Sequence, residues 1–232
     1  MQDILLDERL ETIASLVGEA ASAADIGADH GRLACALLER SPDLMMTVSD
    51  VSAPSLEKAR RLLRERGLLP RVRLCVADGL AGLEAPVEAI IIAGMGSKTI
   101  RGILESGREK IGAARLILQP NLDADQLRMW LCRDGFRIVT ERVARASGRF
   151  YPIICARQGE SEPLSPQEAF LGPRLLRERP LHYEAYLRWL RDVRLREREH
   201  VAHGSTPHAL LRRERLDEQL TWIEEALSCR QG

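Results

Sequence analysis

The sequence predicts an α/β fold built on an open, mostly parallel sheet, because strand-like and helix-like segments alternate along residues 1–157. The connections between these segments are short, which favours helices packed on both faces of the sheet. The stretch 87-VEAIIIAG-94 is almost continuously apolar, as expected of a strand that is buried on both sides. The last two strand-like segments have no helix between them, so we expect an antiparallel hairpin at one edge, with its turn near Ser147-Gly148.

Each element of this fold has a local signal. An amphipathic helix is expected near the start, where apolar residues recur at helical spacing (Leu6, Leu10, Ile13 and Val17). Ser52 is placed to cap a later helix that has Pro54 in its first turn. After the first helix, the expected order is strand 23–27, a helix through Leu33, Leu37 and Leu38 that stops near Ser41, strand 44–50, helix 56–67, strand 72–78, strand 87–94, helix 98–106, strand 115–121, helix 123–135, and strands 136–145 and 150–157.

The composition changes at 158-QGESEPLSP-166, a polar segment that carries prolines. We therefore divide the chain into an α/β domain, 1–157, and a helical domain, 158–232. Helical spacing predicts two helices in the second domain, one through Tyr183, Tyr186, Leu190 and Val193, the other through Leu216, Leu220, Ile223 and Leu227. The turn 203-HGSTP-207 lies between them, with Gly204 ending one helix and Ser205 or Thr206 starting the next, so we expect a coiled-coil-like helical hairpin.

The composition is that of a globular protein, with 45% apolar and 29% charged residues among 232. The net charge is zero, which does not favour bulk attraction to nucleic acid. No apolar run is long enough to span a membrane, and the acidic start is unlike a signal peptide, so a cytoplasmic protein is expected. The five cysteines are dispersed without a CxxC pair, which predicts reduced thiols and no metal site.

Polar residues and glycines gather where the predicted strands end. Ligands of open α/β sheets bind at the carboxyl ends of the strands, so these residues are the candidate site. In chain order they are Asp25, Gly27, Asp29 and His30; Asp50 and Val51; Asp78 and Gly79; Ala93, Gly94, Met95 and Gly96; and Gln119, Pro120 and Asn121.

Several of these residues suit an adenosine-type ligand. Gly27 permits a tight turn and a close approach of the backbone to a ligand. Asp50, about 20 residues further on, is placed to accept the hydroxyls of a ribose. Asp78 is placed to accept from an adenine amino group, and Met95 to lie on a flat ring. Taken singly, Asp50 is equally a helix cap, Asp78 a turn and Met95 a core residue; the combination at five consecutive strand ends favours the cofactor site.

The first loop, 25-DIGADHG-31, indicates which cofactor. A pyrophosphate binds best to glycines at a helix N-terminus without a fixed negative charge. Asp29 places such a charge there, which argues against an NAD(P) oxidoreductase. A cofactor that carries an ammonium and a sulfonium and no phosphate is favoured instead by Asp25 and Asp29. S-adenosylmethionine has these groups together with ribose and adenine.

Three blocks carry a resemblance to a known family: 25-DIGADH-30, 92-IAGMG-96, and 117-ILQPN-121 followed by a helix with 127-LRMWL-131. They resemble the TrmK family of bacterial methyltransferases, which use S-adenosylmethionine to methylate N1 of adenosine at position 22 of tRNA. The resemblance covers the whole chain. It implies a class I Rossmann-like domain followed by a helical, coiled-coil-like domain that contacts tRNA.

With that resemblance we assign provisional roles. Asp29, Gln119 and Asn121 are the predicted catalytic residues, because Asp29 directs a charge toward the sulfonium and the target base while the two amides read a base edge. Adenine N1 has a free lone pair, so positioning is expected to supply most of the rate. The predicted substrate contacts are His30, Arg32, Gly96, Gln119, Pro120, Asn121, Arg191, Arg194, Arg198, Arg212, Arg213 and Arg215.

The sequence departs from the family pattern at two positions. Arg32 stands where family members have an aromatic residue, and Ser97 stands where they have a second glycine after the methionine-glycine pair. If the aromatic residue stacks on the target base, Arg32 would do so through its guanidinium plane.

Alternatives stay open at this point. The acceptor could be another RNA base or a small molecule, and a non-catalytic RNA-binding protein would keep the same fold. His30 either braces the loop by hydrogen bonds or contacts the substrate. The helical hairpin either grips tRNA or serves as a brace or dimer contact, and a monomer or weak dimer is expected.

Overall fold

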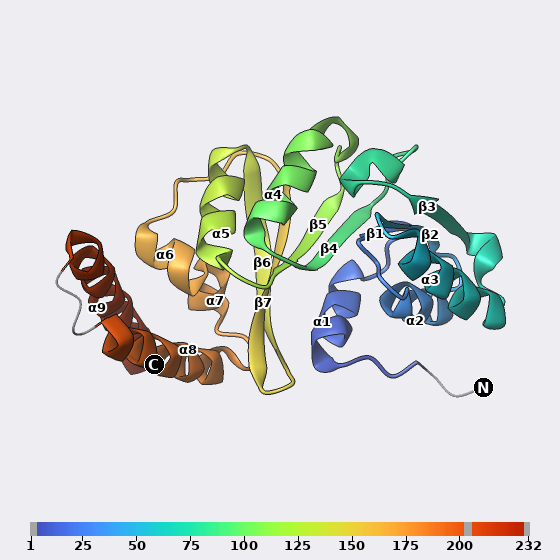
Figure 1. The fold of residues 1–232 in the computed structure, drawn as a ribbon. Helices are drawn as coiled ribbons and strands as arrows, with labels where there is room; N and C mark the ends of the chain where they lie inside the picture. Colours follow the sequence, from blue (N-terminus) through green and yellow to red (C-terminus); the bar gives the residue numbers. More distant parts are fainter. Residues whose placement is uncertain (1–3, 202–205, 230–232) are drawn as a thin grey trace.

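The computed structural model describes residues 4–201 and 206–229. Within these residues, strands form one sheet in the order β3-β2-β1-β4-β5-β7-β6 (Figure 1). Strands β1 to β5 are parallel, whereas β7 is antiparallel to both β5 and β6. The strands are β1 Ser22–Ile26, β2 Met45–Asp50, β3 Val72–Val76, β4 Ala89–Met95, β5 Arg115–Pro120, β6 Phe136–Ala146 and β7 Arg149–Gln158. The predicted mostly parallel sheet with an antiparallel edge hairpin is confirmed.

Helices cover both faces of the sheet (Figure 1). Helices α1 Glu8–Val17, α2 Arg32–Arg40 and α3 Ala53–Glu65 pack on one face, and α4 Ser97–Ser106 and α5 Ala124–Arg133 pack on the other. In β4, Ile91 faces the first layer while Ile90 and Ile92 face the second. The continuous apolar run of this strand is therefore explained by burial on both sides.

Local signals set the boundaries of several elements. The side chain of Ser52 accepts a hydrogen bond from the Ser55 amide at 3.3 Å and caps α3, as predicted. Ser147 and Gly148 both have positive φ, which is the geometry of the tight turn between β6 and β7. Strand β3 ends at Val76, two residues earlier than predicted, because the chain turns there toward the short 3-10 helix η2, Gly79–Gly82.

Two short helices that the sequence analysis did not predict follow the sheet: α6 Pro166–Leu171 and α7 Pro173–Glu178. Their six residues are too few for helical periodicity to show. A cap was nevertheless readable, because Ser165 and Glu168 form a reciprocal capping box at the start of α6.

The two long C-terminal helices are α8 Tyr183–Val201 and α9 Pro207–Ser228. Ion pairs join Arg191 to Glu224 and Arg198 to Asp217, so residue numbers rise in one helix as they fall in the other. This is the predicted antiparallel hairpin. Thr206 caps α9 by accepting from the Ala209 amide, whereas the predicted turn residues 203–205 lie outside the described residues.

A buried ion pair joins the helical part to the sheet. Arg128 of α5 and Glu141 of β6 are both fully buried, and Arg128 Nε donates to Glu141 Oε1 at 2.6 Å. Arg128 Nη1 also donates to the carbonyls of Ala169 and Phe170 in α6. The second carboxylate oxygen of Glu141 accepts from the backbone amide of Arg174 in α7. Burial alone would lower the pKa of Arg128, but the adjacent Glu141 carboxylate raises it above its usual value.

An apolar cluster extends this junction. It brings Val143 of β6 together with Phe170, Leu175 and Leu187 from α6, α7 and α8, and with Ile223 from α9. The expected boundary at 157/158 falls at the end of β7, yet this core is shared across it. The division into two domains stays a prediction.

We expect Arg128→Met or Glu141→Gln to lower the free energy of unfolding by about 3–5 kcal/mol, because each leaves an uncompensated buried group. The double variant Arg128→Met/Glu141→Met is expected to lose less than the sum of Arg128→Met and Glu141→Met. Denaturant unfolding measures both. As a control, Arg188→Met removes an exposed pair with Glu184 (side chains 59% and 57% exposed), and its effect should stay within about 0.5 kcal/mol. Strict additivity would contradict the coupling.

Candidate functional site

The ends of β1 to β5 lie together along one edge of the sheet. The spatial order β3-β2-β1-β4-β5 places the residues after β2 and β3 on one side of the first loop and those after β4 and β5 on the other. The chain reverses its direction of winding between β1 and β4, which is where ligands of such sheets bind. The five predicted groups of residues are therefore brought to one edge.

The first loop is fixed by its neighbours. The amides of Gly27 and Ala28 both donate to the Ser49 carbonyl, at 2.8 and 3.1 Å. Gly27 has φ +71°, and a Cβ there would lie 2.1 Å from Met95 Cε. The positive φ of the turn therefore favours glycine here, and a Cβ would in addition displace the flexible tip of Met95, which approaches from β4. The sequence analysis expected Met95 near a ring; the structure places its tip against the backbone of the first loop.

Asp25 is the buried acid of the site. It is 5% exposed at the end of β1, and burial, followed by the negative charge of Asp50, raises its pKa from 3.8 to about 7. A carboxyl group in this state is stabilised in its charged form by any cation that comes close to it.

Asp50 organises the turn after β2. One carboxylate oxygen accepts from the Asp29 amide at 3.0 Å and the other from the Ser52 amide at 2.8 Å. These two bonds tie the first loop to the start of α3. Each oxygen keeps a free lone pair, so Asp50 can still accept from a ligand. Val51, beside it, is 68% exposed.

Asp29 and His30 lie on the rim of the first loop. The Asp29 side chain is 68% exposed, and its backbone has φ +48°, which aspartate tolerates better than most residues. His30 Nε2 lies 3.0 Å from Lys58 Nζ and 3.4 Å from Asp29 Oδ1. Lys58, from α3, was missed by reasoning that collected only strand ends.

Arg32 donates to the Leu5 carbonyl at 2.8 Å, so its guanidinium holds the N-terminal segment.

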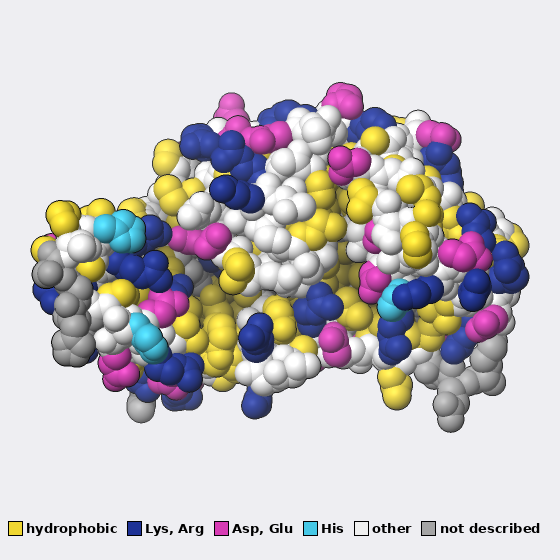
Figure 2. Space-filling view, in the orientation of Figure 1, with side chains coloured by type: hydrophobic (Ala, Val, Ile, Leu, Met, Phe, Trp, Pro, Cys, Tyr) yellow, Lys and Arg dark blue, Asp and Glu magenta, His cyan; other side chains and the backbone are white. Residues whose placement is uncertain are grey.

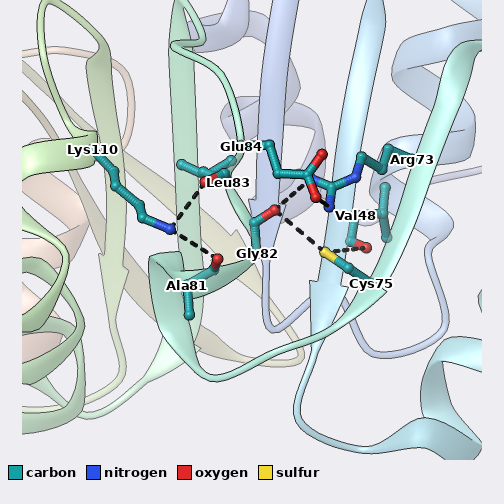
Figure 3. Close-up of polar contacts among 8 residues, drawn as sticks. All are labelled: Val48, Arg73, Cys75, Ala81, Gly82, Leu83, Glu84 and Lys110. Carbon is teal, nitrogen blue, oxygen red and sulfur yellow. Dashed lines mark hydrogen bonds and ion pairs between the residues drawn. The ribbon is translucent and has the colours of Figure 1, made fainter.

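The loop after β3 is clamped from both sides. Lys110 donates to the carbonyls of Ala81 and Leu83, and Arg73 donates to the Gly82 carbonyl and pairs with Glu84 (Figure 3).

This clamp holds the segment that begins with Asp78 and Gly79. The Asp78 side chain is exposed and makes no capping hydrogen bond, whereas Gly79 is buried at φ +52°. The Ala77 amide donates to the Asp50 carbonyl at 3.1 Å, which sets Asp78 beside the end of β2.

A hydrogen-bonded network connects the ends of β4 and β5. Gln119 is fully buried, and its Oε1 accepts from the Gly94 amide at 3.2 Å and from Arg9 Nη1 at 2.7 Å. Gln119 Nε2 donates to Asn121 Oδ1 at 3.0 Å, and Asn121 Nδ2 donates to the Gly94 carbonyl at 2.7 Å. The backbone amide of Asn121 donates to the Met95 carbonyl. Of the two predicted amides, Asn121 is exposed and Gln119 is not.

Arg9 is the second residue that sequence reasoning missed. It lies on α1, four residues before the buried Ile13, so it occupies the inward face of an amphipathic helix. A charged arginine on the inward face of this helix was the signal in the sequence that could have identified it.

The six predicted arginines divide into two groups. Arg194, Arg212 and Arg215 line a cavity of about 460 Å³ together with Pro120 and Asn121. The others, Arg191, Arg198 and Arg213, do not line it.

Five of the six arginines form ion pairs with nearby acids. Figure 2 shows basic and acidic side chains interspersed over the C-terminal helices rather than a continuous basic face. No helix among the described residues is both long and apolar enough to cross a membrane.

The raised pKa of Asp25 has a consequence for stability. In the unfolded chain this group titrates near 3.8, and in the folded protein near 7. The folded state therefore holds more protons between these values, and the contribution is complete below about pH 4 and is lost as pH rises through 7. Up to about 1.4 kcal/mol is lost per pH unit in this window.

We expect Asp25→Asn to lack this dependence. The free energy of unfolding of the wild type minus that of the variant should decrease as the pH rises from 5 to 8. Urea unfolding without cofactor measures this difference. The exposed Asp43→Asn variant is the control and should track the wild type. Parallel curves for Asp25→Asn and the wild type would refute the assignment.

Comparison with known proteins identifies the family. The family model of TrmK, tRNA (adenine(22)-N(1))-methyltransferase, matches residues 23–225. The tRNA (adenine(22)-N(1))-methyltransferase of Bacillus subtilis is 34% identical over 165 residues, which are 70% of this chain and 69% of that protein.

Solved structures of similar proteins have the same fold as this chain. A Streptococcus pneumoniae protein in complex with S-adenosyl-L-methionine is 33% identical, with a TM-score of 0.81 over 96% of this chain and 100% of that one. The structure of Bacillus subtilis TrmK shares the fold, with a TM-score of 0.82 at 24% identity over 97% of this chain and 100% of that one. The five strand ends, the helical hairpin and these matches lead to one conclusion: the chain belongs to the TrmK family of tRNA (adenine(22)-N(1))-methyltransferases.

Proposed function

We propose that this protein transfers a methyl group from S-adenosylmethionine to N1 of the adenosine at position 22 of tRNA, and that the strand ends described above form the site. The observation that carries the proposal is the buried Asp25, which precedes the turn at Gly27. Burial, followed by the negative charge of Asp50, raises its pKa. A ligand with an ammonium and a sulfonium relieves that unfavourable burial of charge, and a phosphate aggravates it. The family membership of the chain supports the same reaction.

The residues present fit this cofactor from end to end. Asp25, Gly27, Asp29 and His30 would hold the methionine part, Asp50 and Val51 the ribose, Asp78 and Gly79 the adenine, and Ala93, Gly94 and Met95 the far wall. When bound, S-adenosylmethionine supplies an electrophilic methyl group on sulfur. The described residues orient the acceptor toward that end of the site.

Asn121 is suited to hold the target adenine. One amide hydrogen is used on the Gly94 carbonyl and one lone pair of Oδ1 is used by Gln119, so one donor and one acceptor remain. Asparagine pairs in this way with N6 and N7 of adenine. That contact uses the N6–N7 edge and leaves N1 free on the Watson–Crick edge of the base.

The exposed Asp29 carboxylate places a negative charge at the rim, where N1 methylation makes the base positive. It can take a proton that the exocyclic amine loses, as can water. Because the adenine N1 lone pair needs no activation, holding the base in line with the methyl group supplies most of the rate. Gln119 is buried, so we assign it to positioning Asn121 rather than to direct contact with the substrate.

We further propose that the cavity between Asn121 and the helical hairpin receives the RNA around the target nucleotide. The target base must leave its stack to expose its Watson–Crick edge. Phe150 and Trp189 line the cavity as platforms for neighbouring bases, and Arg212 and Arg215 line it as phosphate contacts. We also propose action in the cytoplasm by a monomer or weak dimer.

We expect the purified protein to form 1-methyladenosine at position 22 when it is incubated with methyl-labelled S-adenosylmethionine and unmodified tRNA transcripts. Nuclease digestion and mass spectrometry locate the methyl group. A transcript that differs only by guanosine at position 22 should stay unlabelled. Label on another base, or only on rRNA or small acceptors, would overturn the assigned substrate.

We expect Arg212→Ala/Arg215→Ala to raise the KM for tRNA at least fivefold while the affinity for S-adenosylmethionine is unchanged, because both side chains line the cavity beside Asn121. Arg191→Ala/Arg198→Ala is the matched control, since these arginines pair with acids as Arg212 and Arg215 do but lie on the same hairpin outside the cavity. Equal effects of the two double variants would show that the cavity is not the RNA path.

A further inference from the structure

We propose that Arg9 is a positioning residue for methyl transfer, which acts through Gln119 to fix the orientation of the Asn121 amide at the target base. The inference rests on the proposed function and adds to it a residue from outside the strand ends. No contact of Arg9 with cofactor or substrate is needed for this role.

The geometry runs as an unbroken relay from α1 to the rim of the site. Arg9 Nη1 donates to Gln119 Oε1 at 2.7 Å, and Gln119 Nε2 donates to Asn121 Oδ1 at 3.0 Å. Asn121 Nδ2 then donates to the Gly94 carbonyl at 2.7 Å. Gly94 has φ +76°, a backbone conformation that favours glycine, and its position lies within contact distance of Arg9, because a Cβ there would be 3.8 Å from Arg9 Nη1.

The direction of this relay follows from the chemistry of its first member. A guanidinium only donates, so it requires the oxygen of the Gln119 amide to face it. The Gln119 nitrogen must then face Asn121, which must present its oxygen in return. The Gly94 amide donates to the same Gln119 oxygen at 3.2 Å and so reinforces this order. Reversal of Gln119 would set its oxygen against Asn121 Oδ1, so that Asn121 would either lose this contact or reverse and lose its bond to the Gly94 carbonyl. A reversed Asn121 exchanges the donor and acceptor that it offers to adenine N6 and N7.

Arg9 is well placed to impose this order because its own helix is anchored independently. Arg115 Nη1 of β5 donates to the Leu16 carbonyl at 2.8 Å near the end of α1. The Arg145 amide of β6 donates to Glu8 at 2.9 Å near its start. Removal of the Arg9 guanidinium loses its contact over the Tyr151 ring, 5.7 Å from the centroid, but leaves these two bonds between α1 and the sheet in place.

A simpler role for Arg9 would be to fasten α1. Arg115 separates the two roles, because Arg115→Met removes another arginine contact between α1 and β5 without touching Gln119. If Arg9 only fastens the helix, both methionine variants have the same effect. If Arg9 orients Asn121, only Arg9→Met affects the transfer step.

The kinetic test compares Arg9→Met, Arg9→Lys, Arg115→Met, Asn121→Ala and Arg9→Met/Asn121→Ala on an adenosine-22 tRNA transcript. We expect Arg9→Met to lower kcat at least tenfold with the Kd of S-adenosylmethionine within twofold, and Arg9→Lys to recover part of the loss. Arg115→Met should stay within twofold of the wild type. In the Asn121→Ala background, Arg9→Met should lower kcat less than twofold further. Independent, multiplicative losses, or an equal loss in Arg115→Met, would overturn the inference.

A second readout does not depend on the substrate. The side-chain amide resonances of Gln119 and Asn121, recorded by NMR without ligands, should shift or broaden in Arg9→Met and stay in place in Arg115→Met. If the wild type methylates no tRNA, the proposed function fails while this comparison still tests the relay. Unchanged amide resonances in a folded Arg9→Met variant would refute the relay whatever the substrate is.

Discussion

The buried pair of Arg128 and Glu141 is the contact on which the arrangement of the two halves depends. It joins α5, which follows directly from the Asn121 loop, to β6; Arg128 Nη1 reaches the backbone of α6 and the second carboxylate oxygen of Glu141 reaches that of α7. A carboxylate and a guanidinium without solvent tolerate little displacement, since each would otherwise be left unpaired at low dielectric. The short helices α6 and α7 are consequently held against the sheet, and α8 and α9 pack on them in a shared apolar cluster. The hairpin and Asn121 together line one cavity.

Many arginines of this protein stabilise the fold through hydrogen bonds to the backbone, apart from the role in RNA binding that is proposed for some of them. Several guanidinium groups donate to backbone carbonyls at the ends of helices and in loops, namely those of Arg71, Arg73, Arg108 and Arg115. These bonds satisfy acceptors that turns leave open. Most of the arginines predicted to contact RNA are likewise paired with acids in the structure. The abundance of arginine alone therefore says little about nucleic-acid binding here, and the position of each side chain relative to the site decides its proposed role.

The sequence analysis placed residues correctly where they follow parallel strands, whereas their chemical roles stay predictions. Asp25, Gly27 and Asp50 follow parallel strands, and parallel strands bring their carboxyl ends together, so the order along the chain was enough to place them. Arg9 and Lys58 were missed because they reach the site from helices, and no spacing rule connects a helix position to a strand end. Gln119 was expected to touch the substrate, yet its burial was not visible from a short polar motif after a strand. The short α6 and α7 escaped because one or two turns show no periodicity.

Asp25 gives the site a property that a fully ionised carboxylate would lack. Burial, followed by the charge of Asp50, raises the pKa of this group to about 7, so in the protein without ligand it takes up a proton at a far higher pH than an ordinary aspartate. A cation that settles beside it displaces that proton, so binding and proton release are thermodynamically linked. If a cationic ligand binds beside Asp25, its apparent affinity would then rise with pH as the group loses its proton. Under the proposed function, a single carboxyl group on the first loop would link occupancy of the site to the acidity of its surroundings.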